Sequence, residues 1–257
     1  MNIEWDDGTY YVTTRFYGDT TQGAPICVIE CPESPRLFGE NMTNKCVSEC
    51  PDNTYGDQTG NRSCVDLCPN IGGVTWFAQI TEQLCVLVCE EGTWGNYHNT
   101  PIPKCATVPT DCIVGEFADN STNLCVPLCP ESENYFGDPS TRLCVDRCPD
   151  LPLAVVNATA TINLVAGTLY ADYSTRLCVY RCPDDFGPRG TFGDNDTNSC
   201  VHRCPDGTYG DAQTANRHCV DECTPDTFAD NLTNTCVEEC PSSPPYFGDQ
   251  VAWTCVK

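Results

Sequence analysis

The sequence predicts an all-β protein, a disulfide-rich and elongated repeat rod of about twelve small hairpin loops with little or no helix. Three observations lead to this fold class. Cysteine supplies 23 of the 257 residues, a content typical of extracellular folds that disulfides hold together. Glycine (19 residues) and proline (20 residues) are frequent, which favours turns over long helices. A unit of about 19 residues recurs along the chain, and a period of that length is typical of repeat architectures.

One copy of the unit, residues 50–65, has the sequence CPDNTYGDQTGNRSCV. We expect a hairpin in which the aromatic residue lies on the first strand and the acidic residue opens the turn by bonding the backbone two residues on. A threonine then closes the turn, which points outward, and the second strand ends at Cys-Val. The triplets of an aromatic residue, Gly or Ala, and Asp or Asn begin at Tyr17, Phe38, Tyr55, Trp94, Phe117, Phe136, Tyr170, Phe192, Tyr209, Phe228 and Phe247, with Trp76 or Phe77 in a degenerate twelfth copy.

The cysteine spacing favours a scheme of simple loops, in which each Cys-Pro cysteine pairs with the next Cys-Val cysteine. The predicted pairs are Cys31 with Cys46, Cys50 with Cys64, Cys68 with Cys85, Cys89 with Cys105, Cys112 with Cys125, Cys129 with Cys144, Cys148 with Cys178, Cys182 with Cys200, Cys204 with Cys219, Cys223 with Cys236, and Cys240 with Cys255. An interlocked scheme, in which Cys27 pairs with Cys46 and Cys31 with Cys50, remains open and leaves Cys240 unpaired.

In the preferred scheme Cys27 has no partner, because residues 16–28 look like the second half of a repeat without its opening Cys-Pro. Several alternatives are open for this cysteine: a free buried thiol, a truncated repeat, an intramolecular bridge in a different pairing scheme, or an intermolecular bridge to another subunit.

The repeat pattern divides the chain into four segments: 1–27 with an N-terminal strand and a half repeat, 28–148 and 179–257 with cysteine-rich repeats, and 149–178 with a long insertion. Two stretches depart from the pattern, the β-prone Thr9 to Tyr17 and the apolar Leu151 to Leu169. Because an exposed apolar strand invites pairing with another chain, both are candidate subunit contacts. The alternative for the insertion is a hairpin packed on its own chain.

Six Asn-x-Ser/Thr acceptors predict N-linked glycans. They are Asn41, Asn61, Asn120, Asn157, Asn195 and Asn231. Four of them, Asn41, Asn120, Asn195 and Asn231, directly follow the acidic turn residue, so we expect a row of glycans along the turn tips.

Neither a metal site nor a catalytic site is expected, and the chain is not predicted to be an enzyme. Calcium is favoured over zinc because the turns repeat carboxylates, but turn formation explains these residues better. The carboxylates are Asp57, Asp119, Asp138, Asp194, Asp211 and Asp230. The three histidines, His98, His202 and His218, stand in no zinc-ligand motif, and no nucleophile, phosphate-loop or dinucleotide motif occurs. No cofactor is expected apart from glycans.

The formal net charge of −23 argues against nucleic acids and anionic membranes as partners, since both require cationic surface. The sequence has no apolar run long enough for a membrane span and no visible secretory signal. Because the cysteines and glycan acceptors still predict an extracellular or cell-surface location, we expect the chain to be a mature or partial product.

The period CPxxxxYGDxxTxxCVxxCP, which covers roughly residues 16–257, resembles the cysteine-rich, furin-like repeat proteins on the surfaces of ciliates and other unicellular eukaryotes. More loosely, it resembles the cysteine-rich rods of growth-factor receptors. The resemblance implies a stalk, coat, adhesive rod or matrix fibre. The expected function is therefore a structural extracellular glycoprotein that forms a homopolymeric fibril, appendage or coat. The alternative is a receptor-like or adhesive ectodomain that binds a ligand.

Overall fold

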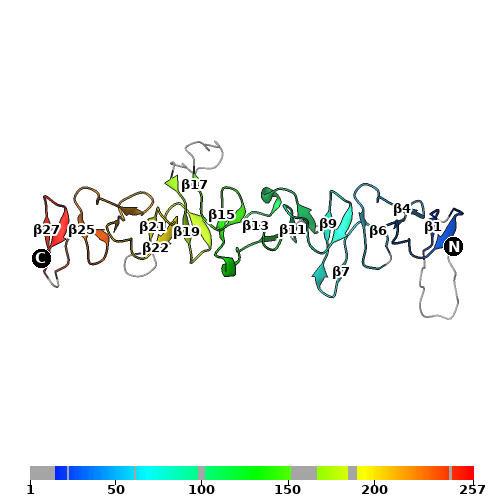
Figure 1. Ribbon diagram of the computed structural model, residues 1–257, viewed down its shortest axis with the longest axis horizontal. Helices are drawn as coiled ribbons and strands as arrows, with labels where there is room; N and C mark the ends of the chain where they lie inside the picture. Colours follow the sequence, from blue (N-terminus) through cyan, green and yellow to red (C-terminus); the bar gives the residue numbers. More distant parts are fainter. Residues whose placement is uncertain are drawn as a thin grey trace. The chain divides into compact units, whose positions relative to one another are not determined.

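The computed structural model describes residues 15–21, 23–60, 62–97, 102–151, 167–184, 190–242 and 245–257. Within these ranges the chain consists of short strands joined by turns, with two 3-10 turns at Pro109–Asp111 and Glu131–Glu133 (Figure 1). The predicted all-β, disulfide-rich fold of repeated hairpins is confirmed. The chain forms two compact units, Met1–Val126 and Pro127–Lys257, which are described separately. The division into four segments remains a prediction.

The first unit contains six antiparallel hairpins of the repeat type. They are β1 (Tyr17–Asp19) with β2 (Ile26–Val28), β3 (Phe38–Glu40) with β4 (Lys45–Val47), β5 (Tyr55–Gly56) with β6 (Cys64–Val65), β9 (Phe77–Gln79) with β10 (Leu84–Val86), β11 (Trp94–Asn96) with β12 (Lys104–Ala106), and β13 (Phe117–Asp119) with β14 (Leu124–Val126). An additional small hairpin joins β7 (Asn70–Ile71) to β8 (Val74–Thr75). Because β9 begins at Phe77, this residue and not Trp76 is the aromatic residue of the degenerate copy.

The second unit also contains six hairpins of the repeat type. They are β15 (Phe136–Asp138) with β16 (Leu143–Val145), β19 (Tyr170–Asp172) with β20 (Leu177–Val179), β21 (Phe192–Asp194) with β22 (Ser199–Val201), β23 (Tyr209–Gly210) with β24 (Cys219–Val220), β25 (Phe228–Asp230) with β26 (Thr235–Val237), and β27 (Phe247–Asp249) with β28 (Thr254–Val256). The insertion begins and ends in a small ladder of β17 (Asp150–Leu151) with β18 (Gly167–Thr168).

Eleven disulfides close the loops, and they join the same pairs of cysteines as the scheme of simple loops. The loop closed by Cys148 and Cys178 spans 30 positions because it contains the insertion. Cys27 is free, as the preferred scheme requires, but it is exposed and not buried. Whether Cys27 bridges to another chain remains a prediction.

Successive hairpins within a unit are joined by parallel pairing, which the sequence pattern did not indicate. The first strand of one hairpin pairs with the second strand of the next, as Gly18 does with Lys45 and Ala171 with Ser199. In each case the middle residue of the first strand donates its backbone N–H to the carbonyl just before that second strand. We call this contact the inter-hairpin joint, and ten of these bonds lie within the two units, five in each.

The core is divided among these joints. The aromatic ring of one hairpin packs on the disulfide of the next, as Tyr170 does on Cys182 and Cys200. The ring also covers the Gly or Ala of the next triplet so closely that a Cβ on Gly193 would lie 2.4 Å from the ring of Tyr170. Where one hairpin follows another within a unit, the small residue of its triplet therefore makes room for the ring of the preceding hairpin and not for the ring of its own strand.

Candidate functional site: turn tips and inter-hairpin joints

The acidic residue at the end of each first strand organises the turn as the sequence predicts. In the turn after Asp119, the Oδ1 atom accepts the backbone N–H of Ser121 at 3.0 Å, and the Oδ2 atom accepts the hydroxyl of Thr122 at 2.6 Å. Glu40 takes the same place in its hairpin. It accepts hydrogen bonds from the Thr43 hydroxyl and from the backbone N–H groups of Met42 and Thr43, and these bonds hold the pKa of the Glu40 carboxyl below its ordinary value.

The acidic side chains themselves lie inside these turns, which the sequence pattern did not indicate. Most of the turn carboxylates are buried, and Asp119 and Asp138 have no exposed surface. The reason is that the backbone and hydroxyl donors of the turn fold over the carboxylate and replace water as its partners. The residue after the acid, not the acid itself, occupies the exposed tip.

Four of the predicted glycan acceptors lie at these tips, and each is exposed. The Oδ1 atom of each accepts a hydrogen bond from the polar aromatic side chain of the preceding hairpin. The bonds are Tyr17 Oη to Asn41 at 3.0 Å, Trp94 Nε1 to Asn120 at 3.0 Å, Tyr170 Oη to Asn195 at 2.7 Å, and Tyr209 Oη to Asn231 at 2.6 Å. Asn61 and Asn157 lie outside the described residues.

The last residue of most turns has a positive φ. Its residue type varies with the aromatic residue of the preceding hairpin. Where that aromatic residue is Trp or Tyr, an Asn follows in several joints: Asn123, Asn198 and Asn234 donate Nδ2 to the carbonyls of Cys89, Cys148 and Cys204. We call these amide joints.

Where the preceding aromatic residue is Phe, the positive-φ residue is Arg in three joints, and its guanidinium lies over the ring. The distances to the ring centre are 5.4 Å for Arg62 over Phe38, 4.5 Å for Arg176 over Phe136, and 4.9 Å for Arg217 over Phe192. We call these cation–π joints. The sequence pattern did not reveal either kind, although the Arg and Asn positions recur in step with the aromatic residues and could have indicated them.

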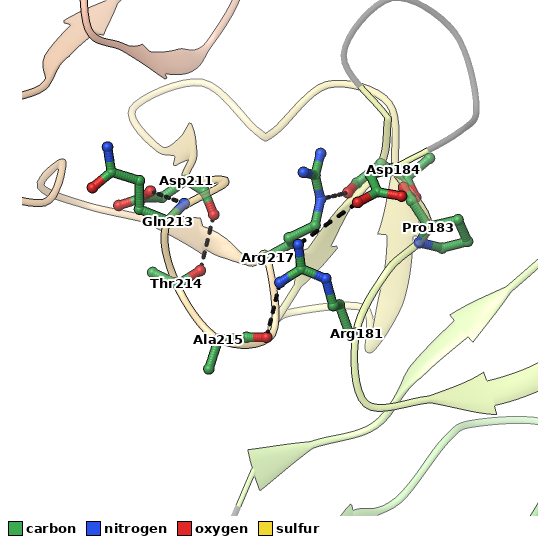
Figure 2. A network of polar contacts seen from close by, with 9 residues as sticks. Arg181, Pro183, Asp184, Asp211, Gln213, Thr214, Ala215 and Arg217 are labelled. Carbon is green, nitrogen blue, oxygen red and sulfur yellow. Dashed lines mark hydrogen bonds and ion pairs between the residues drawn. The ribbon is translucent and has the colours of Figure 1, made fainter.

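The joint between β21 and β24 is of the cation–π kind. Figure 2 shows the polar contacts of Arg181 and Arg217 near this joint. Arg217 Nε donates to the carbonyl of Thr191 at 3.3 Å. Burial and the neighbouring Arg181 lower the pKa of the Arg217 guanidinium, and Asp184 opposes this shift. Arg181 itself lies nearer the surface, where it donates to the carbonyl of Ala215 at 3.1 Å.

Two further titratable side chains at the joints, Tyr170 and His218, have shifted pKa values. Burial, followed by the nearby Tyr180, Asp150 and Asp194, raises the pKa of Tyr170 to about 12. Burial lowers the pKa of His218, with Asp211 acting in the opposite direction.

The residues considered as metal ligands do not come together in the part of the chain that the structure describes. The six turn aspartates belong to separate turns, and no cluster of three or more His, Cys, Asp or Glu side chains suited to a metal ion occurs in this part of the chain. His98 lies outside the described residues. Likewise, no helix in the described ranges is both long and apolar enough to cross a membrane.

The chain is similar to cysteine repeat modular protein 2 of Tetrahymena thermophila. The two sequences are 26% identical over 188 residues, and the match covers 49% of this chain and 10% of the relative. The matching region is thus a small part of the relative's length. No family model and no solved structure matches the chain. Together with the eleven disulfides, the match supports a cysteine-rich repeat protein of an extracellular structural or surface kind; its furin-like character remains a prediction.

Proposed function

We propose that this chain is a structural glycoprotein, a subunit of an extracellular fibril, surface appendage or coat. The observation that supports this most is the inter-hairpin joint, which recurs in both units with the same backbone bond. In repeat proteins of this kind, stability comes from each hairpin repeat and from its contact with the next repeat. The chain can therefore extend without a common core. A repeat array of this kind is suited to a structural role in a fibril or a surface coat.

The turn tips support the glycoprotein part of the proposal. N-linked glycans attach to the Nδ2 atom of asparagine, and at Asn120, Asn195 and Asn231 the joint uses only the Oδ1 atom. A glycan and the aromatic hydrogen bond are therefore compatible on the same side chain. The turn tips would present glycans to solvent, while the aromatic rings and disulfides beneath them stabilise the fold.

The proposed subunit contacts include two stretches, Thr9 to Tyr17 and Leu151 to Leu169. Residues 9–14 and 152–166 lie outside the described residues, so these contacts rest on the β-prone and apolar character of the sequence.

Two measurements on protein secreted from eukaryotic cells test the proposal. Peptide mass spectrometry after enzymatic glycan release in heavy-oxygen water should find Asp in place of Asn at Asn41, Asn120, Asn195 and Asn231. Sedimentation velocity under non-reducing conditions should find species much larger than a single chain. A single monomeric species at all concentrations, with a ligand that protects residues 151–169 from proteolysis, would instead support a binding ectodomain.

A further inference from the structure

Successive turns of the second unit lie on opposite edges of its strand array. The joints between hairpins are parallel, as between β19 and β22 and between β23 and β26, with a parallel bridge between the hairpins of β21 and β23. Because the two strands of each hairpin are antiparallel, a parallel joint reverses the direction of the next turn. The turns at 195–198 and 231–234 therefore lie on one edge, and those at 173–176 and 211–218 lie on the other.

The described glycan acceptors of this unit lie on only one of these edges. Asn195 and Asn231 each begin a turn of the first edge, which we call the acceptor edge. No Asn-x-Ser/Thr sequence occurs in the turns at 173–176 and 211–218, whose edge we call the bare edge. Glycans on the acceptor edge would therefore leave the bare edge open to another protein.

The turn at 211–218 lies between two linkers on the bare edge. Nη1 of Arg181, in the linker from β20 to β21, donates to the carbonyl of Ala215 at 3.1 Å (Figure 2). The backbone N–H of Thr224, in the linker from β24 to β25, donates to Oδ2 of Asp211 at 3.1 Å. Hydrogen bonds thus hold one linker from each side of the array beside the same turn.

These two linkers carry opposite charges at the same repeat position. Arg181 and Glu222 each directly precede the cysteine that opens a disulfide loop. Arg181 is 45% exposed, and its ion pair with Asp184 is long, at 3.8 Å. Glu222 and its neighbour Asp221 are exposed. The bare edge therefore presents a cation on one side of the turn and two anions on the other.

We propose that the bare edge of one chain binds the bare edge of a second copy in antiparallel orientation, with the two-fold axis at the turn 211–218. This inference rests on the proposed structural function and specifies a lateral contact between its subunits. Arg181 of each chain then faces Asp221 and Glu222 of the other, so the opposite charges meet twice. The axis passes through a tip whose exposed residues are uncharged: Ala212, Gln213 and Ala215.

A second copy fits this edge because its charges have the same spacing in the reverse order. The parallel orientation would place Arg181 on Arg181 and Glu222 on Glu222, and like-charge contacts disfavour it. Exposed ion pairs stabilise little one at a time, so the contact is weak and salt should weaken it further. Weak pairing of this kind can hold neighbouring chains of a fibril or coat side by side, where many contacts act together.

The acceptor edge has matching charges but a different turn between them. Arg203 and Glu239 hold the same repeat positions one hairpin later. Nη2 of Arg203 donates to Oδ1 of Asn234 at 3.3 Å, so this arginine lies beside the turn at 231–234. The turn begins at Asn231, and a glycan there would occupy the place in which a second chain would have to lie. The position of the glycans therefore selects the bare edge for pairing.

Charge reversal tests the contact in the full chain, secreted from eukaryotic cells and measured by light scattering over a concentration series. Arg181→Glu and Glu222→Arg should each raise the concentration at which half of the chains associate by at least about tenfold, because each places like charges at both contacts. An equimolar mixture of the two variants should associate like the wild type. A mixed pair again has a cation against an anion at both contacts.

The acceptor edge supplies the matched controls. Arg203→Glu and Glu239→Arg reverse the charges at the same repeat positions and should associate like the wild type. These controls separate the contact from the effect of net charge, since they change the charge of the chain by the same amounts.

A glycan placed on the bare edge gives an independent test. Ala212→Asn creates an Asn-x-Thr acceptor with Gln213 and Thr214 at the exposed tip, in the place that Asn231 takes on the acceptor edge. The glycosylated variant should lose association by at least about tenfold, and enzymatic removal of the glycan should restore it. Ala212→Gln, which creates no acceptor, should associate like the wild type.

The outcomes distinguish this contact from the proposed function. If the wild type assembles and Arg181→Glu and Glu222→Arg assemble equally well, the edge contact is wrong while the structural function stands. If both variants are weakened and their mixture does not recover, the contact is also wrong. If the wild type stays monomeric, both proposals are overturned. Loss in each variant with recovery in the mixture supports the contact.

Discussion

The phenol of Tyr170 donates a 2.7 Å hydrogen bond to Oδ1 of Asn195, which lies at the turn tip of the next hairpin. Tyr170 is 1% exposed and Asn195 is exposed, so the bond joins the interior of one joint to the surface that carries the predicted glycan acceptor. Only the neutral phenol can donate this bond. The packing of this joint and the orientation of the glycan acceptor therefore both depend on the protonation state of Tyr170.

Replacing Tyr170 with Phe should weaken this joint by about 0.5–1.5 kcal/mol, the usual net contribution of a hydrogen bond. Hydrogen exchange of the amides in the loop closed by Cys182 and Cys200 measures the loss. Tyr173→Phe is the matched control, because Tyr173 is 56% exposed and its ring contact with Phe136 does not need the hydroxyl. Equal exchange in the two variants would contradict the role of the bond.

The same tyrosine predicts a loss of stability in alkali. The pKa of Tyr170 is about 12 in the folded chain, above the value of about 10 for a free tyrosine. The folded state therefore holds the proton more tightly, and its stabilising effect falls as the pH rises from about 10 through 12. The absorbance difference between wild type and Tyr170→Phe should show this late ionisation.

Arg176 should contribute more to the stability of its joint than a surface arginine does. Its Nη2 atom donates to the carbonyls of Pro130 at 3.0 Å and Tyr135 at 2.6 Å while the guanidinium covers Phe136. We expect Arg176→Met to cost about 2–3 kcal/mol, from the charged hydrogen bonds and the cation–π contact together. Hydrogen exchange of the amides in the loop closed by Cys129 and Cys144 measures this loss of stability.

Two further variants define the origin of that effect. Arg176→Lys should recover only part of the stability, because an ammonium cannot stack and bond to both carbonyls in the same way. Arg181→Met, at a side chain that is 45% exposed, should cost little. Full recovery by lysine would show that charge alone matters at this joint.

Gly193 should not tolerate even a methyl group without cost. A Cβ there would lie 2.4 Å from the ring of Tyr170, and overpacking of this kind costs about 1–3 kcal/mol. Gly60→Ala is the control because no heavy atom lies within 4 Å of its Cβ position. If thermal unfolding gives the same midpoint for both variants, the ring of Tyr170 does not pack against residue 193 as the structure shows.

The joint that contains His218 should loosen in acid. Burial lowers the pKa of His218 below its ordinary value of 6.5, so the unfolded chain binds the proton more readily. Stability is therefore present at neutral pH and is lost as the pH falls below about 6.5. Hydrogen exchange in the loop closed by Cys204 and Cys219 should accelerate between about pH 7.5 and 5.5, after correction for intrinsic rates, and His218→Gln should remove this change.

The loops were predictable from the sequence because their chemistry is local. The two cysteines of the unit at 50–65 and the Asp57 turn lie in one short stretch, so their spacing and the ability of Asp to bond two residues ahead indicate a closed hairpin. The same holds for the exposed position of Asn41, which follows the turn residue directly.

The joints were not predictable in the same way because they connect different copies. Whether Gly193 makes room for its own Phe192 or for Tyr170 depends on how one hairpin stacks on the next. The burial of Asp119 likewise depends on donors that fold over it rather than on its polarity. A comparison of each aromatic residue with the Arg or Asn in the following turn would have indicated the two joint types.

Electron microscopy of the oxidised, glycosylated protein tests the structural role most directly. The account predicts that the wild-type chain forms regular polymers under native, non-reducing conditions. Well-separated single chains of the wild type, under the same native and non-reducing conditions, would contradict it.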